Sequence, residues 1–304
     1  MFYLRHRYKS LNANFKLRTL VVQIGPNEKG IMATKKVADM VFANSELAKT
    51  YIEFRPSPPD SLIKKVIESV REKRPSPLQL CVDVGCGSGQ STEQLATSFE
   101  NVIGVDVSPD QLEVARSRNT FKNISYREGS AYSIPVDSSS VDLVSVCAAV
   151  HWFDMKPFYA EVDRVLQPGG ILACYSYHGC SPVYQGQSFR KEFLEIWDRL
   201  NEYWSEGHNH LRTDYSELPQ LYSEDFLLRG FSVEQDVSLD TVIGYMWSWS
   251  ALTKKRQKEG DEAADRFVQD CRDRLLSAMG TQETNPPMKR RYDYFLRLWR
   301  KPVS

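Results

Sequence analysis

The chain has 304 residues, of which 41% are hydrophobic and 26% are charged, and its formal net charge is zero. This composition is that of an ordinary globular protein, and a net charge of zero provides no overall attraction to nucleic acid. No apolar run approaches the roughly 18 residues that a membrane-spanning helix needs, so we expect neither nucleic acid nor a membrane as a partner. The six cysteines form no CxxC pair and no zinc-type spacing, which favours a reducing compartment and no metal site.

Residues 1–31 are predicted to form a basic N-terminal extension. They carry Lys and Arg interleaved with apolar residues and have no acid before Glu28. This pattern is typical of an amphipathic mitochondrial presequence. The alternative is an extension with no role, since Met32 would serve equally well as a start. We therefore expect a cytoplasmic protein, or a mitochondrial one if residues 1–31 act as a presequence.

Residues 32–77 are predicted to be N-terminal helices. A helical pattern beginning near Val37 leads to the stretch 51–56, and prolines at 58 and 59 separate it from a second helix. In that second helix apolar residues recur at helical spacing from Leu62 to Val70, which indicates a face that packs on a sheet.

Strand and helix patterns alternate over residues 78–180. We predict a doubly wound, mostly parallel α/β sheet with right-handed crossovers, because strands separated by helices at this spacing require them. Ser108-Pro109-Asp110-Gln111 is a capping box with proline at the first helical position. The expected strands are 80–84, 101–106, 124–127, 141–147 and 171–175, with helices at 92–99, from 109 onward, and at 155–166.

The alternation stops in residues 181–304. We expect this part to supply a helical lid and the last strands of the same domain, with an aromatic-rich helix at 189–204, a strand at 233–239, a charged helix at about 256–279 and a final strand at 292–299. His208-Asn209-His210 is expected to be a solvated loop rather than a metal site. Asn285 to Met288 is also expected to be a loop, and Trp247 and Trp249 are either lid core or substrate contacts.

The stretch from Leu80 to Gln90 is an apolar strand that ends in an acid and opens into alternating glycines. Glycines at 85, 87 and 89 allow a ligand to approach the backbone N–H groups, and a helix beginning near Ser88 would point its positive end at that ligand. Asp106, about 20 residues later, is placed to accept hydrogen bonds from ribose hydroxyls. Gln90 stands where a dinucleotide fingerprint would have its third glycine, which disfavours a nicotinamide cofactor.

Four motifs, in the expected order over residues 78–176, resemble those of the class I S-adenosylmethionine-dependent methyltransferases. They are Val82-Asp83-Val84-Gly85-Cys86-Gly87-Ser88-Gly89, Gly104-Val105-Asp106-Val107-Ser108, Gly129-Ser130-Ala131 and Leu166-Gln167-Pro168-Gly169-Gly170. Three further motifs resemble the trans-aconitate methyltransferase type and its uncharacterised relatives. These are Tyr51-x-x-Phe54-Arg55-Pro56, His151-Trp152-Phe153-Asp154 and Trp249-Ser250. The resemblance implies a Rossmann-like sheet of seven strands, the last antiparallel, and S-adenosylmethionine as cofactor.

The resemblance also implies which residues hold that cofactor. The three glycines would lie against its amino-acid part, Asp83 would reach toward its amino group, and Asp106 would take both ribose hydroxyls. Ser130 and Ala131 would lie by the adenine, where many relatives carry an acid in place of the serine. The implied cofactor residues are Asp83, Gly85, Gly87, Gly89, Asp106, Val107, Ser130 and Ala131.

The expected reaction is methyl transfer to a small molecule, with an acidic acceptor such as a tricarboxylate favoured by the closer resemblance. His151 is the candidate base, or else a rim histidine packed on Trp152. Arg55 and Tyr51 are candidates for holding a substrate carboxylate, although Arg55 could also be an ordinary ion-pair residue. A carboxylate is already ionised near pH 7 and needs no base. The alternatives are a methyltransferase-fold binding protein without catalysis and a nicotinamide-dependent oxidoreductase.

Overall fold

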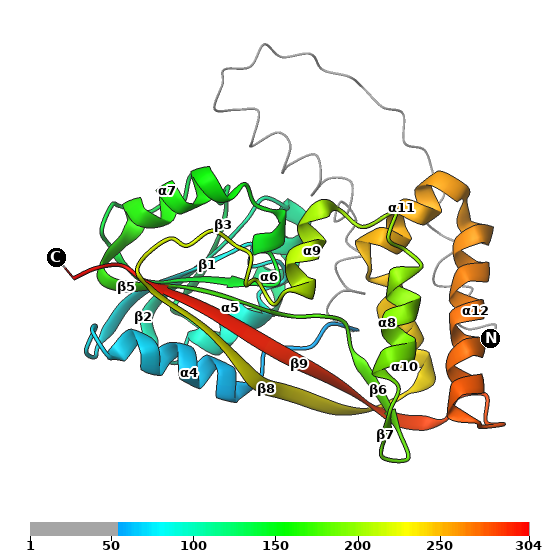
Figure 1. Cartoon of the computed structure of the whole chain (residues 1–304). Coiled ribbons are helices and arrows are strands. Elements are labelled where there is room, and N and C mark those ends of the chain that lie inside the picture. Colours follow the sequence, from blue (N-terminus) through cyan, green and yellow to red (C-terminus); the bar gives the residue numbers. More distant parts are fainter. Residues whose placement is uncertain (1–53, 304) are drawn as a thin grey trace, which may run out of the picture.

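A nine-stranded sheet forms the centre of the computed structural model, which describes residues 54–303 (Figure 1). The strand order is β3-β2-β1-β4-β5-β9-β6-β7, and β8 pairs with β9. The strands are β1 (Leu78–Val84), β2 (Phe99–Asp106), β3 (Ile124–Glu128), β4 (Val141–Cys147), β5 (Leu166–Tyr177), β6 (Ser181–Tyr184), β7 (Gln187–Ser188), β8 (Glu224–Ser238) and β9 (Pro287–Arg300). The helices are α4 (Asp60–Arg71), α5 (Gln90–Leu95), α6 (Pro109–Arg118), η2 (Val150–Trp152), α7 (Met155–Val165), α8 (Arg190–Asp198), η3 (Glu206–His208), α9 (Asn209–Arg212), α10 (Leu239–Trp247), α11 (Ser250–Glu259) and α12 (Asp261–Met279).

The first five strands are parallel, and the last strand is antiparallel to β5, as predicted. The short hairpin of β6 and β7 adds two strands to the predicted seven, and strands of two to four residues are too short to show a pattern in the sequence. The chain order reverses beside β1, which pairs with both β2 and β4. In such sheets ligands bind beyond the carboxyl ends of the strands at this reversal.

Both faces of β1 are covered, which explains its nearly continuous apolar sequence. Cys81 packs into one apolar core together with α4, whereas Val82 and Val84 pack into the other core with residues of α7. The predicted apolar face of α4 is confirmed, since Leu62, Ile63, Val66, Ile67 and Val70 are all buried.

The lid, which consists of α8, η3, α9, α10, α11 and α12, differs from its predicted helices in two places. The predicted helix at 189–204 ends at Asp198, and Trp204 lies in the turn that follows. The predicted charged helix is two helices, because Gly260 has φ +91° and separates α11 from α12. Trp249 is fully buried and packs on Trp197, so it belongs to the lid core.

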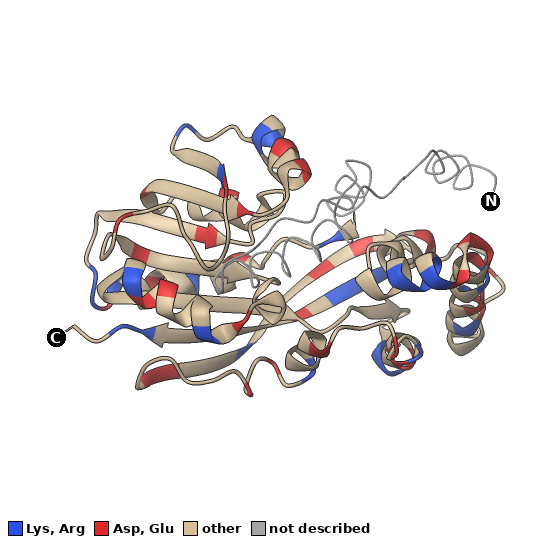
Figure 2. Cartoon of the chain, turned by 90° about the horizontal axis from the view of Figure 1, so that it is seen from above, with Lys and Arg blue, Asp and Glu red and all other residues tan. Residues whose placement is uncertain are grey.

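Charged residues of both signs are interspersed over the described elements (Figure 2). Cross-strand pairs tie β8 to β9, among them Lys289 with Glu234 at 2.7 Å and Arg297 with Asp225 at 2.7 Å. Among residues 54–303, no helix combines the length and the apolar character needed to cross a membrane.

Candidate active site

The glycine turn after β1 lies at the reversal of strand order. Gly85, Gly87 and Gly89 have φ of +69°, +54° and +85°, values at which an L side chain is strained. Two of these glycines are also required by close packing: a Cβ on Gly85 would lie 2.7 Å from the Cβ of Ala149, and one on Gly89 would overlap the hydroxyl of Tyr126. The turn therefore needs glycine for both conformation and space.

Asp106, at the end of β2, anchors this turn. Its Oδ2 accepts a hydrogen bond from the Gly87 N–H at 2.8 Å and its Oδ1 accepts one from the Ser108 N–H at 2.9 Å. Burial raises the pKa of this carboxyl group above its ordinary value, and the backbone donors oppose that shift. Because each carboxylate oxygen can accept more than one bond, the group can also receive ribose hydroxyls.

The predicted capping box forms only in part. Ser108 Oγ accepts from the Gln111 N–H, but the Ser108 N–H is bound by Asp106, so the Gln111 side chain does not return to cap it. Gln111 instead lines the cavity beside the glycine turn, and its buried Oε1 has no partner among the described residues. Gln111 is not predicted as a site residue from the sequence, because the capping pattern already accounts for a glutamine at this position.

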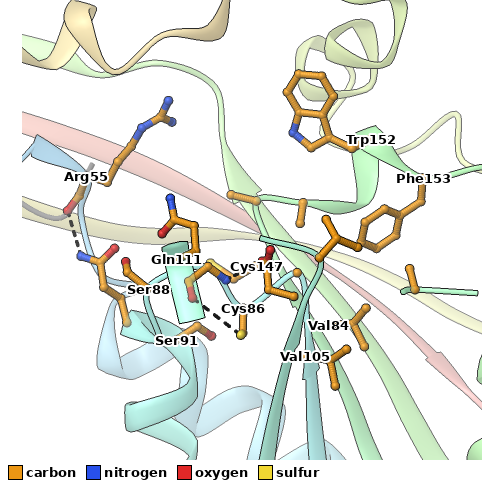
Figure 3. Close-up of a pocket in the computed structure, with 18 of the residues that line it drawn as sticks. Arg55, Val84, Cys86, Ser88, Ser91, Val105, Gln111, Cys147, Trp152 and Phe153 are labelled. Carbon is orange, nitrogen blue, oxygen red and sulfur yellow. Dashed lines mark hydrogen bonds between the residues drawn. The ribbon is translucent and has the colours of Figure 1, made fainter. Parts of the chain in front are cut away.

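A first cavity, which measures about 1150 Å³ together with the open space at its mouth, lies over the glycine turn (Figure 3). Five of the predicted cofactor residues line it, namely Gly85, Gly87, Asp106, Val107 and Ala131. The other three, Asp83, Gly89 and Ser130, do not line it. Figure 3 shows Arg55 and Trp152 on opposite sides of the opening above the turn.

Asp83 lies beneath the turn and not in the cavity wall. It is fully buried, and its Oδ2 accepts from the Thr92 hydroxyl at 2.7 Å, whereas its Oδ1 has no partner among the described residues. Burial raises the pKa of Asp83 to about 6, against the hydrogen bonds from Thr92 and Ser145. Its contact with the amino group of a cofactor stays a prediction.

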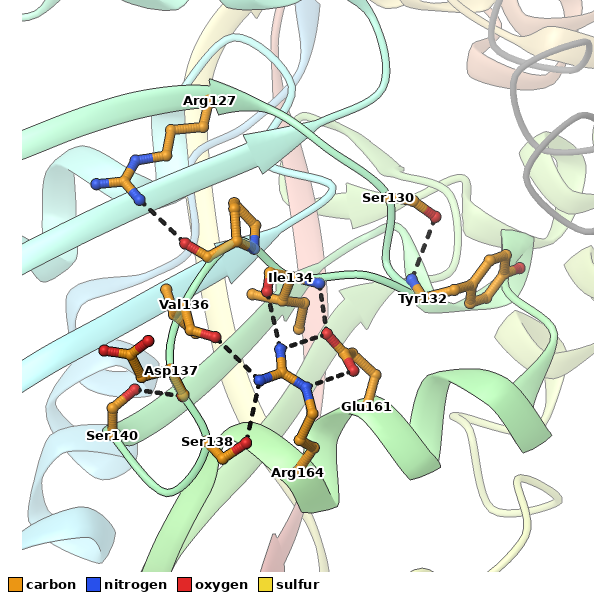
Figure 4. Close-up of polar contacts among 11 residues, drawn as sticks. Arg127, Ser130, Tyr132, Ile134, Val136, Asp137, Ser138, Ser140, Glu161 and Arg164 are labelled. Atoms are coloured by element: carbon orange, nitrogen blue, oxygen red, sulfur yellow. Dashed lines mark hydrogen bonds and ion pairs between the residues drawn. The ribbon is translucent and has the colours of Figure 1, made fainter. Parts of the chain in front are cut away.

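The loop 129–140 closes one end of the first cavity and is held by α7 (Figure 4). Arg164 donates to the carbonyl oxygens of Ile134 at 2.9 Å and Val136 at 3.0 Å, and Glu161 accepts from the Ile134 N–H at 2.6 Å. Ser130 Oγ accepts from the Tyr132 N–H at 3.2 Å, so this hydroxyl stabilises the loop itself.

A second and smaller cavity, which measures about 490 Å³ together with the open space at its mouth, adjoins the first. Four residues line both cavities: Arg55, Ala148, Trp152 and Tyr177. Lid residues and the predicted His151 close the second cavity, so the sheet and the lid build it together. Its further walls include Trp197, Trp204, His208, Tyr245, Ser248 and Ser250.

His151 and His208 meet in the second cavity, with ring centroids 4.8 Å apart. Burial lowers the pKa of His151 well below its ordinary value, with further lowering by His208 and Arg55. Burial also lowers the pKa of His208 to about 3, so both rings are neutral near pH 7. The expectation that His208 lies in a solvated loop is wrong, because the side chain is only 7% exposed. Trp204, His208 and Leu211 recur in the sequence at helical spacing, and this pattern is the signal that could have indicated a buried His208.

Arg55 is positioned by both the sheet and the lid. It donates to the Tyr177 hydroxyl at 3.1 Å, to Ser248 Oγ at 3.1 Å and to the Ser248 carbonyl oxygen at 3.0 Å, and its guanidinium lies 5.2 Å from the ring centre of Tyr245. These contacts fix a cation at the junction of the two cavities. The predicted partner Tyr51 lies outside the described residues.

Comparisons with known proteins agree with this geometry. Residues 82–174 match the family model described as a methyltransferase domain. A Dictyostelium discoideum protein that bears the name of a methyltransferase is 32% identical over 208 residues, which are 67% of this chain and 75% of that protein. This chain is an S-adenosylmethionine-dependent methyltransferase.

Two further relatives support the assignment. A Saccharomyces cerevisiae protein named as a probable S-adenosylmethionine-dependent methyltransferase is 28% identical over 162 residues, and the match spans 52% of this methyltransferase and 50% of the yeast protein. A solved structure from Anaeromyxobacter dehalogenans, named as a type II methyltransferase, has a TM-score of 0.63 and 28% identity, and covers 82% of this chain and 99% of its own. The comparisons support the class I family and do not single out the trans-aconitate type. They also remove the nicotinamide-dependent alternative.

The residues of this methyltransferase fit its cofactor. The first cavity has the open glycine backbone and the acid at the end of β2 that a nucleoside with an amino-acid tail requires. Gln111 Oε1 in its wall is buried and has no partner within residues 54–303, which indicates a polar group still to be bound.

Proposed function

We propose that this methyltransferase transfers a methyl group to a carboxylate oxygen of a small molecule bound in the second cavity. The Arg55 guanidinium in the wall of that cavity supports the proposal most strongly. Among the described lining residues Arg55 is the one formally charged group, since His151 and His208 are neutral and none is acidic. The forked geometry of a guanidinium suits a carboxylate.

Two buried hydroxyl groups add to this preference. Tyr245 Oη and Ser250 Oγ belong to the cavity wall and have no hydrogen-bond partner among the described residues. A buried polar group without a partner is costly, so a bound anion that accepts from these hydroxyls would be stabilised.

The histidines favour an acceptor that needs no base. His151 binds the Tyr215 hydroxyl through Nδ1 at 3.1 Å, and its low pKa makes it a weak base. A carboxylate is ionised at neutral pH, whereas a phenol or an ammonium group must first lose a proton. His151 then acts as a packing and positioning residue on Trp152, with ring centroids 5.3 Å apart.

In the proposed complex, Asp106 and the backbone of residues 85–87 bind the nucleoside and amino-acid parts of the cofactor. The cofactor supplies an electrophilic methyl group on a sulfonium. The acceptor oxygen forms its bond to the methyl carbon as the carbon–sulfur bond breaks and the electron pair remains on sulfur, so no proton is released. Arg55 orients the carboxylate and the aromatic wall excludes water, which are the main contributions that the chain can make to such a reaction.

Replacement of Arg55 tests this proposal. The purified chain is incubated with methyl-labelled cofactor and a set of small carboxylic acids, and KM is measured for each product-forming acid. We expect Arg55→Lys to raise KM about tenfold, because the charge stays and the forked geometry is lost. The affinity for S-adenosylhomocysteine should change less than threefold. Arg190→Gln is the matched control, because Arg190 also donates to a backbone carbonyl, that of His178, but lines neither cavity. Methylation of phenols or amines with no acid methylated would contradict the proposal.

A further inference from the structure

The side-chain amide of Gln111 is a polar group that the fold places at the first cavity and does not itself use. Gln111 lies in the first turn of α6, is only 4% exposed and lines the cavity. Neither Oε1 nor Nε2 of this side chain has a hydrogen-bond partner among the described residues. A buried polar group without partners is costly, so the amide lowers the stability of the cofactor-free chain unless a ligand binds it.

The turn between β2 and α6 explains why this amide has no partner there. In a complete capping box the glutamine side chain would bind the N–H of Ser108. Here Asp106 Oδ1 accepts from that N–H at 2.9 Å, while Ser108 Oγ accepts from the backbone N–H of Gln111. The carboxylate therefore takes the capping position of the amide, and the backbone bond still keeps Gln111 beside the glycine turn.

The amide borders the space over Gly87. A Cβ on Gly87 would meet one described atom within 4 Å, which is Gln111 Oε1 at 3.8 Å. The N–H of Gly87 binds Asp106 Oδ2 at 2.8 Å, so the amide and the carboxylate flank the same residue of the turn. Oε1 is the fully buried end of the amide, whereas Nε2 keeps some accessible surface. Figure 3 shows the side chain reaching toward the opening between Arg55 and Trp152.

We propose that Gln111 is a second ribose-binding residue of the cofactor site, whose amide N–H donates to a ribose hydroxyl that itself donates to Asp106. A hydroxyl suits this position because it can donate to a carboxylate and accept from an amide at the same time. The cofactor ammonium has no lone pair to accept the amide N–H, and the cofactor carboxylate has no hydrogen to give Asp106. This assignment concerns the cofactor and does not depend on the acceptor proposed above.

Gln111→Met tests the inference in the full chain, because methionine has a similar length and flexibility but no amide. Calorimetric titration measures the binding of S-adenosylhomocysteine and of its 2′-deoxy, 3′-deoxy and deaminated analogues. The variant should bind S-adenosylhomocysteine about fivefold more weakly, which is the effect of one neutral hydrogen bond. This loss should shrink to less than about twofold with the 2′-deoxy or the 3′-deoxy analogue, and it should remain with the deaminated analogue. Gln111→Leu should show the same pattern.

Thermal unfolding without cofactor separates this role from a structural one. Gln111→Met removes a buried amide that the fold does not use, so its unfolding midpoint should stay level or rise. Gln94→Met is the matched control, because Gln94 Oε1 is also buried without a partner among the described residues and the side chain lines neither cavity. Gln94 Nε2 donates to the Pro58 carbonyl oxygen at 2.9 Å, so this variant should have a lower midpoint. Its affinities for the four ligands should all change by the same factor.

Three results would overturn the assignment. The first is a Gln111→Met variant that binds S-adenosylhomocysteine as tightly as the wild type. The second is an equal loss of affinity for all four ligands with a lowered unfolding midpoint, which would show that the amide supports the fold. The third is a loss that disappears only with the deaminated analogue, which would place the amide at the cofactor ammonium.

Discussion

Replacing Asp106 with alanine is expected to weaken cofactor binding strongly. The carboxylate lines the first cavity and is held in place by the N–H groups of Gly87 and Ser108 at 2.8 and 2.9 Å. In the proposed complex it accepts hydrogen bonds from two ribose hydroxyls. A hydrogen bond to a charged group contributes about 1.5 kcal/mol or more, so losing two costs about 3 kcal/mol. This corresponds to an increase of about 100-fold in the dissociation constant.

Calorimetric titration with S-adenosylhomocysteine measures this change directly. Thermal unfolding of the same samples is needed as well, because the variant also removes the acceptor of two backbone donors in the turn. Asp110→Asn is the control, since Asp110 lies four residues away on α6 and does not line the first cavity. A folded Asp106→Ala variant whose affinity stays within threefold of the wild type would refute the proposed role of Asp106.

Three further predictions concern the elements around the turn. Gly89→Ala should lower the free energy of unfolding by about 2 kcal/mol or more, because the new Cβ overlaps Tyr126 at a strained φ, and Tyr126→Phe should restore part of it in denaturant unfolding. The raised pKa of Asp83 stabilises the fold at low pH, so the stability of the wild type relative to Asp83→Asn should fall by about 2 kcal/mol between pH 4 and 6 and become level above about pH 7; a flat difference from pH 4 to 6 would contradict its protonation. Arg164→Gln should loosen the loop 129–140 and weaken S-adenosylhomocysteine binding by about 1 kcal/mol, with Lys156→Gln as the unaffected control on the same helix.

The parallel core could be predicted from the sequence because β1, β2, β4 and β5 each contain a short apolar run, whereas β3 (ISYRE) is short and mostly polar and is indicated by its place between two helices and turns. In β1, Val82 and Val84 point to one face of the sheet and Cys81 and Asp83 to the other, and all four side chains are buried. Such a run indicates a strand that is covered on both faces. The final antiparallel strand could also be predicted, because aromatic and charged residues alternate along it.

The lining of the cavities could be predicted only in part. Neighbours in the glycine motif face different ways: Gly87 opens to the first cavity, whereas Gly89 packs on Tyr126 and Asp83 lies beneath the turn. A motif gives the order of such residues but not the side on which each one lies. The position of His208 depends on Gly207 approaching the His151 carbonyl across 56 residues of chain, a contact that local sequence patterns do not encode.

The chemical class of the product tests the central proposal most directly. The chain is incubated with methyl-labelled cofactor and a metabolite extract, and the labelled products are treated with mild base. Methyl esters hydrolyse under these conditions and release labelled methanol, whereas methyl ethers and methylamines keep the label. We expect most of the enzyme-dependent label to be released as methanol, and label that stays on the products after base would contradict a carboxylate acceptor.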